Sequence, residues 1–129
     1  MYVKKSAILI IDDEQSVADA LKVILNDNGY DAVVALTGRD GLEQAGRRQF
    51  DLTITDLQLP DITGLEVLAL IREMNPNHRV IIITAHISPD IITKAADGGA
   101  VTVLAKPFLP TDILKLMKEV LANRETARL

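Results

Sequence analysis

Five short apolar runs, separated by segments with helical periodicity, most constrain how this chain can fold. The runs are rich in β-branched residues, and most are apolar without alternation, which is typical of strands covered on both faces. They are Ala7–Ile11, Ala32–Leu36, Leu52–Thr55, Val80–Thr84 and Val101–Leu104.

A segment with helical spacing follows each apolar run. An apolar stripe from Val17 to Leu25 ends at Asn28-Gly29, a dipeptide typical of helix ends. The other helical segments cover 41–48, 65–74, 90–97 and a last stretch that begins near Pro110. Alternating strands and helices predict βαβ units, and therefore an α/β fold with a five-stranded parallel sheet flanked by five helices.

Length and composition bound the class of protein. The 129 residues predict one domain over 1–129, with a core of about 6–122 and a helix extension or linker start at 123–129. The content of 48% hydrophobic residues supports a packed core, and the net charge of −4 argues against non-specific nucleic-acid binding. The absence of cysteine excludes disulfides and cysteine-based zinc sites. No apolar run approaches the roughly 18 residues of a membrane span, so we expect a cytoplasmic protein.

Polar residues follow four of the expected strands directly. In a parallel α/β sheet, ligands bind at the carboxyl ends of the strands, which share one edge. We therefore expect the side chains at these strand ends to converge there. They are Asp12 and Asp13 after the first strand, Asp56 after the third, Thr84 after the fourth and Lys106 after the fifth.

This set of residues favours phosphoryl transfer onto an aspartate. Three carboxylates without a nearby histidine or cysteine favour a hard cation, and Mg²⁺ fits best if a phosphate completes its coordination. Lys106 can pair with Asp56 or with phosphate oxygens, and the Thr84 hydroxyl can bind an anion. A carboxylate is a recognised nucleophile in such chemistry, which depends mainly on positioning and charge neutralisation.

The acidic run Asp12-Asp13-Glu14 by itself also fits a simpler interpretation. A strand can leave the core into solvated residues that cap the next helix, and Glu14 is expected in the first turn, where the helix dipole favours an acid. The residues at the other strand ends favour the metal site over this alternative.

Four motifs together resemble the receiver domains of two-component response regulators. They are "IIDDE", "TITDLQLPDITG", "IIITAH" and "AKPF", which occur in this order between Ile8 and about Leu121. The resemblance implies a flavodoxin-like, doubly wound sheet with strand order 2-1-3-4-5. It also implies a phosphohistidine donor on a partner histidine kinase or histidine phosphotransfer protein. Such a domain is no turnover enzyme, because it catalyses only its own phosphorylation and dephosphorylation.

The resemblance also implies the role of each site residue. Asp56 is the expected phosphoacceptor and Asp13 a direct Mg²⁺ ligand, while Asp12 binds the ion largely through water. The backbone carbonyl of Gln58 is a further expected ligand.

Three more residues are expected around the phosphoryl group. Thr84 and the amide of Ala85 are expected to hold its oxygens, and Lys106 to pair with them. The family also implies a cis bond between Lys106 and Pro107.

Three positions depart from the family pattern or admit two interpretations. The family usually has an aromatic switch residue three positions before the lysine, where this chain has Val103, so the aromatic half of the switch is lost. His86, with Gln58, is expected either to tune the lifetime of the phosphoaspartate or to be a solvent-facing loop histidine. His78 is expected to be a surface loop residue in a turn.

Two rival functions belong to other classes. A degenerate receiver would act as a phosphorylation-independent protein-binding module, which only Val103 favours. A phosphatase with an aspartyl-phosphate intermediate would need a further acid/base residue and a cap domain, and neither is evident. For the phosphorylated domain we expect a homodimer through the face of the fourth and fifth strands and helices. Candidate contacts are Ile87, Ile91, Leu104, Lys94, Asp97 and Lys115.

Overall fold

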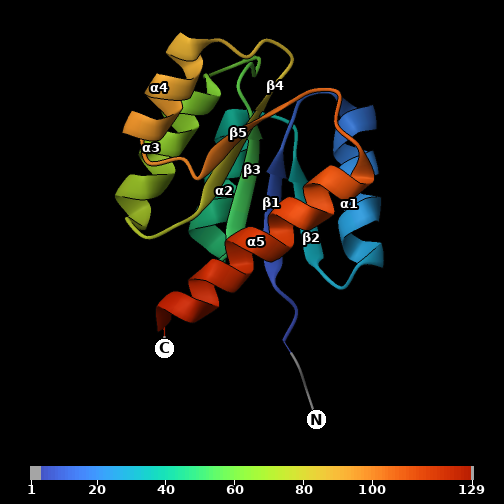
Figure 1. The fold of residues 1–129 in the computed structure, drawn as a ribbon. Helices are drawn as coiled ribbons and strands as arrows, with labels where there is room; N and C mark the ends of the chain where they lie inside the picture. The colour runs from blue at the N-terminus through green and yellow to red at the C-terminus, as the bar shows by residue number, and fades with distance from the viewer. Residues whose placement is uncertain (1–3, 129) are drawn as a thin grey trace.

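A five-stranded parallel sheet forms the centre of the computed structural model, which describes residues 4–128, with side chains for 4–122 (Figure 1). Its order is β2-β1-β3-β4-β5, which confirms the predicted doubly wound topology. Ile10 of β1 pairs with Ile54 of β3, and Ile54 pairs in turn with Ile81 of β4. The strands are β1 (Ala7–Ile11), β2 (Asp31–Ala35), β3 (Leu52–Asp56), β4 (Val80–Thr84) and β5 (Thr102–Ala105).

Five helices cover the two faces of the sheet. Helices α1 and α5 pack on one face, and α2, α3 and α4 pack on the other (Figure 1). No helix within the described residues is long and apolar enough to cross a membrane. The helices are α1 (Gln15–Asp27), α2 (Gly38–Arg47), α3 (Gly64–Met74), α4 (Pro89–Asp97) and α5 (Pro110–Arg128).

Burial on both faces explains why the strands are apolar without alternation. In β1, Ile8 and Ile10 join the core beneath α1 and α5, whereas Leu9 and Ile11 join the core beneath α2, α3 and α4. All four are completely buried, and each contributes roughly 2 kcal/mol through the hydrophobic effect.

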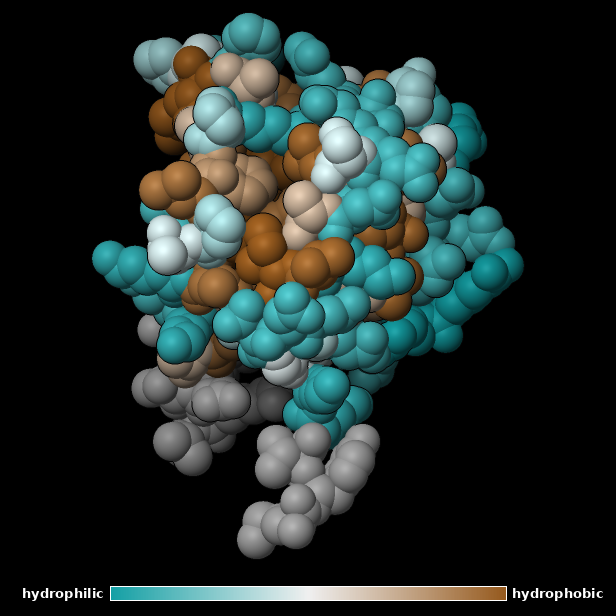
Figure 2. Space-filling view, turned by 90° about the vertical axis from the view of Figure 1, so that its right-hand side faces the viewer, coloured by the Kyte–Doolittle hydropathy of each residue, from teal (hydrophilic) through white to brown (hydrophobic). Residues whose placement is uncertain are grey.

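The side of the molecule on which α1 lies has apolar side chains gathered in one part of a mostly hydrophilic surface (Figure 2).

Side-chain caps determine where three helices begin. The hydroxyl groups of Thr37, Thr63 and Ser88 accept hydrogen bonds from amides in the first turns of α2, α3 and α4. Helix α2 therefore begins at Gly38, three residues before the predicted start. Strand β5 lies one residue later than predicted, and its side chains are only partly covered because it is an edge strand. Helix α5 runs to Arg128, and Leu129 lies outside the described residues.

Candidate functional site

Three aspartates meet at the carboxyl ends of β1 and β3. Asp12 follows β1 and is fully buried, Asp56 is the last residue of β3 and is buried, and Asp13 is exposed. One carboxylate oxygen from each lies within 4.8 Å of the others. This confirms the prediction that the acids converge. Such a group of oxygen donors without nitrogen or sulfur suits a hard divalent cation.

Lys106 links the fifth strand to these acids. Its ammonium lies 2.9 Å from Asp12 Oδ2, 3.0 Å from Asp56 Oδ2 and 3.3 Å from Glu14 Oε1. Its own amide donates to the carbonyl of Thr84 at 2.8 Å, which places the lysine at the end of β4. Burial lowers the pKa of Lys106, but the contacts with Asp12 and Asp56 outweigh burial and raise the pKa above its ordinary value. The lysine is therefore a permanent cation in the site.

Asp12 carries a carboxylate that the protein alone does not fully satisfy. Burial raises its pKa above the ordinary value, although the amide of Glu14, 2.9 Å from Oδ1, and the ammonium of Lys106 oppose this effect. Its other oxygen, Oδ2, is close to the Lys106 ammonium but has no hydrogen bond. The ion pair with Lys106 is therefore the contact that holds Oδ2, and this oxygen, beside two further carboxylates, can also serve as a ligand of a bound cation.

A cleft of about 280 Å³ opens above the acids. Thr84 lies at its wall with a buried side chain, and its hydroxyl accepts a hydrogen bond from the amide of His86 at 3.1 Å. His86 itself is exposed and does not line the cleft. The bond between Lys106 and Pro107 is cis, as predicted. The cleft is lined by Asp13, Glu14, Asp56, Gln58, Leu59, Pro60, Thr84, Ala85 and Lys106.

The loop after Asp56 is held tightly against the end of its strand. The amide of Gly64 donates to the carbonyl of Leu57 at 2.7 Å, and Gln58 pairs with Thr63 as an isolated antiparallel bridge. A Cβ atom on Gly64 would lie 2.3 Å from the carbonyl oxygen of Asp56, so only glycine fits. This geometry fixes the backbone of Gln58 beside Asp56.

Asp61 anchors the same loop to α2 and was missed by the sequence analysis. Its carboxylate accepts hydrogen bonds from the amides of Gly38 and Arg39, both at 2.9 Å. Burial alone raises the pKa of Asp61, but these amides outweigh it and hold the pKa below its ordinary value. Asp61 lies 23 residues after Gly38 in the chain, so no local sequence pattern predicts this contact.

The structure places two residues, Glu14 and His78, differently from the sequence prediction. Glu14 precedes α1 as its N-cap residue, without a side-chain cap, instead of lying in the first turn, and it contacts Lys106. His78 is not a surface residue: it is 8% exposed, and its Nε2 atom lies 2.8 Å from the buried Thr53 hydroxyl.

The expected switch and dimer positions differ in exposure. Val103 is half-buried and packs against the core beneath α2, α3 and α4. Ile87 is 43% exposed, whereas Ile91 and Leu104 are partly buried against the two cores. Lys94 is exposed and pairs with Asp90 at 3.1 Å.

Residues 8–118 match the family model of the response regulator receiver domain. The chain belongs to this family. It is 36% identical over 127 residues to the alginate biosynthesis transcriptional regulatory protein AlgB of Pseudomonas aeruginosa, covering 98% of this chain and 28% of that protein. It is 33% identical to sporulation initiation phosphotransferase F of Bacillus subtilis, covering 88% of this chain and 92% of that protein.

Solved structures agree with this assignment. The receiver domain protein from Methanospirillum hungatei superimposes with a TM-score of 0.93 at 31% identity, over 96% of this chain and 99% of that one. Several curated relatives are longer, since the chain spans 28%, 45% and 22% of the length of three of them. Receiver domains are signalling domains that bind Mg²⁺ at an acidic pocket, and this chain has a cluster of three carboxylates, Asp12, Asp13 and Asp56.

Proposed function

We propose that this receiver domain accepts a phosphoryl group on Asp56 from a phosphohistidine of a partner histidine kinase or phosphotransfer protein. One observation carries the proposal: the Lys106 ammonium lies 3.0 Å from Asp56 Oδ2, in a cleft that Asp13 and Thr84 also line. A nucleophilic carboxylate, a fixed cation and a hydroxyl therefore face the same space.

The reaction forms a bond between a carboxylate oxygen of Asp56 and the phosphorus atom, while the bond from phosphorus to the donor imidazole nitrogen breaks. Asp12, Asp13, Asp56 and the backbone carbonyl of Gln58 would hold Mg²⁺. The bound ion would neutralise the carboxylate and phosphoryl charges. Lys106 neutralises further charge as the phosphoryl group arrives.

The hydroxyl of Thr84 and the amide of Ala85 line the same cleft and would receive the phosphoryl oxygens. The amide of His86 donates a hydrogen bond to the Thr84 hydroxyl. Movement of Thr84 toward the phosphoryl group would therefore draw the loop that contains His86 toward the site. His86 lies outside the cleft, so an influence on phosphoaspartate lifetime would act through this loop.

The output is proposed to pass through the face of β4, α4, β5 and α5. Ile87 and Ile92 are 43% and 49% exposed there, a pair of large apolar side chains suited to a partner or a second copy. Val103 cannot swing a ring between buried and exposed positions, so the loop movement itself would transmit the signal. If the receiver domain is part of a longer protein, we propose that it controls transcription or another activity of an attached output domain.

Intact-mass spectrometry after incubation with acetyl phosphate and Mg²⁺ tests the proposal. We expect a gain of one phosphoryl group (~80 Da) that requires the metal and that Asp56→Ala abolishes. Absence of the adduct, together with absence of fluoroberyllate binding, would overturn the phosphoacceptor role and favour a phosphorylation-independent binding module.

A further inference from the structure

Glu14 lines the acidic cleft but does not belong to the group formed by Asp12, Asp13 and Asp56. It is the N-cap residue of α1, yet its side chain makes no capping hydrogen bond. An acid at this end of a helix is favoured by the helix dipole, but here the carboxylate turns to a different partner.

That partner is Lys106, 92 residues further along the chain. Lys106 Nζ donates a hydrogen bond to Glu14 Oε1 at 3.3 Å and another to Asp56 Oδ2 at 3.0 Å. The backbone of Glu14 is also held, since its amide donates to Asp12 Oδ1 at 2.9 Å. Glu14 therefore shares the ammonium that would neutralise an arriving phosphoryl group.

Glu14 is the contact that Lys106 can exchange at least cost. Its side chain is 60% exposed, whereas that of Asp56 is 8% exposed and that of Asp12 is fully buried. Exposed ion pairs contribute little to stability, because water solvates the carboxylate when the contact breaks. Loss of either aspartate contact would instead leave a buried charge without its cation. An arriving phosphoryl group would therefore replace Glu14 on the ammonium.

Glu14 also determines the net charge of the cleft with a divalent cation bound. The three aspartates and Glu14 supply four negative charges against the single positive charge of Lys106. With these groups ionised, a bound divalent cation would leave one net negative charge, whereas without Glu14 it would leave none.

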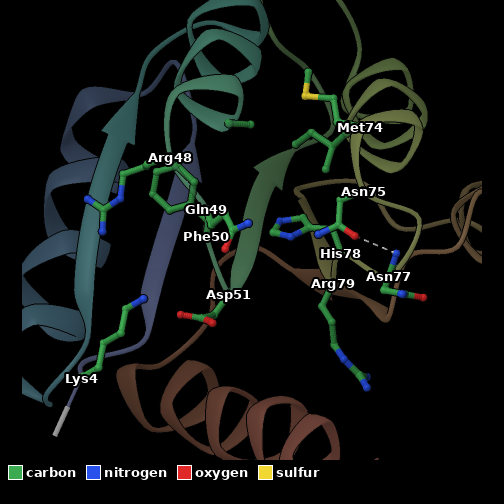
Figure 3. Close-up of a pocket in the computed structure, with 12 residues that line it drawn as sticks. Lys4, Arg48, Gln49, Phe50, Asp51, Met74, Asn75, Asn77, His78 and Arg79 are labelled. Atoms are coloured by element: carbon green, nitrogen blue, oxygen red, sulfur yellow. Dashed lines mark hydrogen bonds between the residues drawn. The ribbon is translucent and has the colours of Figure 1, made fainter. Parts of the chain in front are cut away.

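The opposite edge of the sheet has a different balance of charge. A hollow at the start of β3 and β4 is lined by three cations, Lys4, Arg48 and Arg79, and by one carboxylate, that of Asp51 (Figure 3). The negative excess at the cleft is therefore a property of the edge that carries Asp56.

We propose that Glu14 is a specificity-determining residue that slows phosphorylation by free dianionic phosphoryl donors. This role depends on phosphorylation of Asp56, the function proposed above. A small dianion meets the charge of Glu14 and competes with it for Lys106. A phosphohistidine on a partner protein offsets the same cost through protein contacts around the cleft, which a small anion cannot make.

Phosphorylation rates with two small phosphoryl donors test this role in Glu14→Gln, at saturating Mg²⁺ and low salt. At neutral pH acetyl phosphate carries two negative charges and phosphoramidate a net single one, so repulsion acts more strongly on acetyl phosphate. We expect Glu14→Gln to raise the rate about threefold with acetyl phosphate and less than about twofold with phosphoramidate. The gain should shrink in about 0.5 M salt, which screens exposed charges.

Mg²⁺ affinity, measured from amide chemical shifts in ¹H–¹⁵N spectra, gives a readout that does not depend on phosphorylation. Glu14→Gln should weaken Mg²⁺ binding about threefold, because it removes a negative charge from the cleft that receives the ion. The rate and the affinity should thus change in opposite directions, whereas a general disturbance of the site would lower both.

Two further variants separate charge from structure. Glu14→Asp keeps the charge and should stay within about twofold of the wild type in both measurements. Glu73→Gln removes the same charge from an exposed position near the end of α3, beside Met74 at the opposite edge of the sheet (Figure 3), and should change neither.

An unchanged or lower rate of Glu14→Gln with acetyl phosphate would overturn the role of Glu14 and leave the phosphoacceptor role of Asp56 intact. An equal gain with phosphoramidate, or the same gain in Glu73→Gln, would do so as well. Failure of the wild type and Glu14→Gln alike to be phosphorylated would overturn the phosphoacceptor role, and the role of Glu14 with it.

Discussion

The ammonium of Lys106 lies 2.9 Å from Asp12 Oδ2, although the two residues belong to loops at the ends of β5 and β1. Asp56, the central carboxylate, is 3.0 Å from the same ammonium. One cation therefore joins two buried acids and neutralises part of their mutual repulsion before any phosphoryl group is present. Removal of the lysine, a change of pH and a bound metal should all act on this one group of charges.

Lys106→Met should lower the free energy of unfolding by about 3 kcal/mol in metal-free buffer, because it leaves two buried carboxylates without their cation. Mg²⁺ should restore stability more in this variant than in the wild type, since the metal replaces the lost positive charge. Urea unfolding with and without Mg²⁺ measures both effects. Lys94→Met is the control: its pair with Asp90 is exposed and should be worth less than about 1 kcal/mol. Equal Mg²⁺ effects in Lys106→Met and the wild type would contradict this account.

Asp12→Asn should change how stability depends on pH. The folded protein raises the pKa of Asp12 above its ordinary value of 3.8. Its contribution therefore favours folding most below pH 3.8 and is lost as the pH rises through the folded-state pKa. In metal-free buffer, the stability of Asp12→Asn relative to the wild type should thus increase from pH 3.8 toward neutral pH.

Thermal unfolding across this pH range measures the difference between the two proteins. With Mg²⁺ at neutral pH, the wild type should be more stable than Asp12→Asn, because the wild-type carboxylate binds the metal ion and the amide binds it poorly. An unchanged difference across the pH range would show that Asp12 titrates alike in both states.

Gly64→Ala should disturb the loop that follows Asp56, whereas Gly46→Ala should not. A Cβ at position 64 meets the Asp56 carbonyl oxygen at 2.3 Å and Leu57 Cα at 2.9 Å, both backbone atoms that cannot turn aside. We expect a loss of about 2 kcal/mol of stability and slower phosphorylation by acetyl phosphate. Nothing lies within 4 Å of a Cβ at Gly46, an exposed position in α2, where alanine should add up to about 1 kcal/mol.

The buried contact between His78 and Thr53 should be measurable as a coupling. His78→Ala should cost about 2 kcal/mol, because it removes a buried side chain and leaves the Thr53 hydroxyl without this partner. A double-mutant cycle with Thr53→Val, followed by urea unfolding, should give a coupling of about 1 kcal/mol. Additive effects within about 0.3 kcal/mol would contradict a direct hydrogen bond.

The apolar runs and the residues that end them predicted an α/β fold with a parallel sheet and the convergence of the strand-end side chains, whereas the strand order and the role of each residue came from the resemblance to receiver domains. Runs such as Ala7–Ile11 lack alternation because they are buried on both faces, and a parallel sheet brings Asp12, Asp56 and Lys106 to one edge. This follows from local periodicity together with the geometry of parallel strands, and both can be read along the chain.

The tertiary structure alone decided which loop side chains contact one another. His78 looked like a turn residue, yet it is buried against Thr53, and Asp61 caps a helix that begins 23 residues before it. Lys106 contacts Asp12 and Glu14 as well as Asp56, the partner that the sequence predicted. These contacts join residues far apart in the chain, and their formation depends on the path of each loop over the sheet. Periodicity reports which side of a strand or helix faces the core, but carries no information about that path.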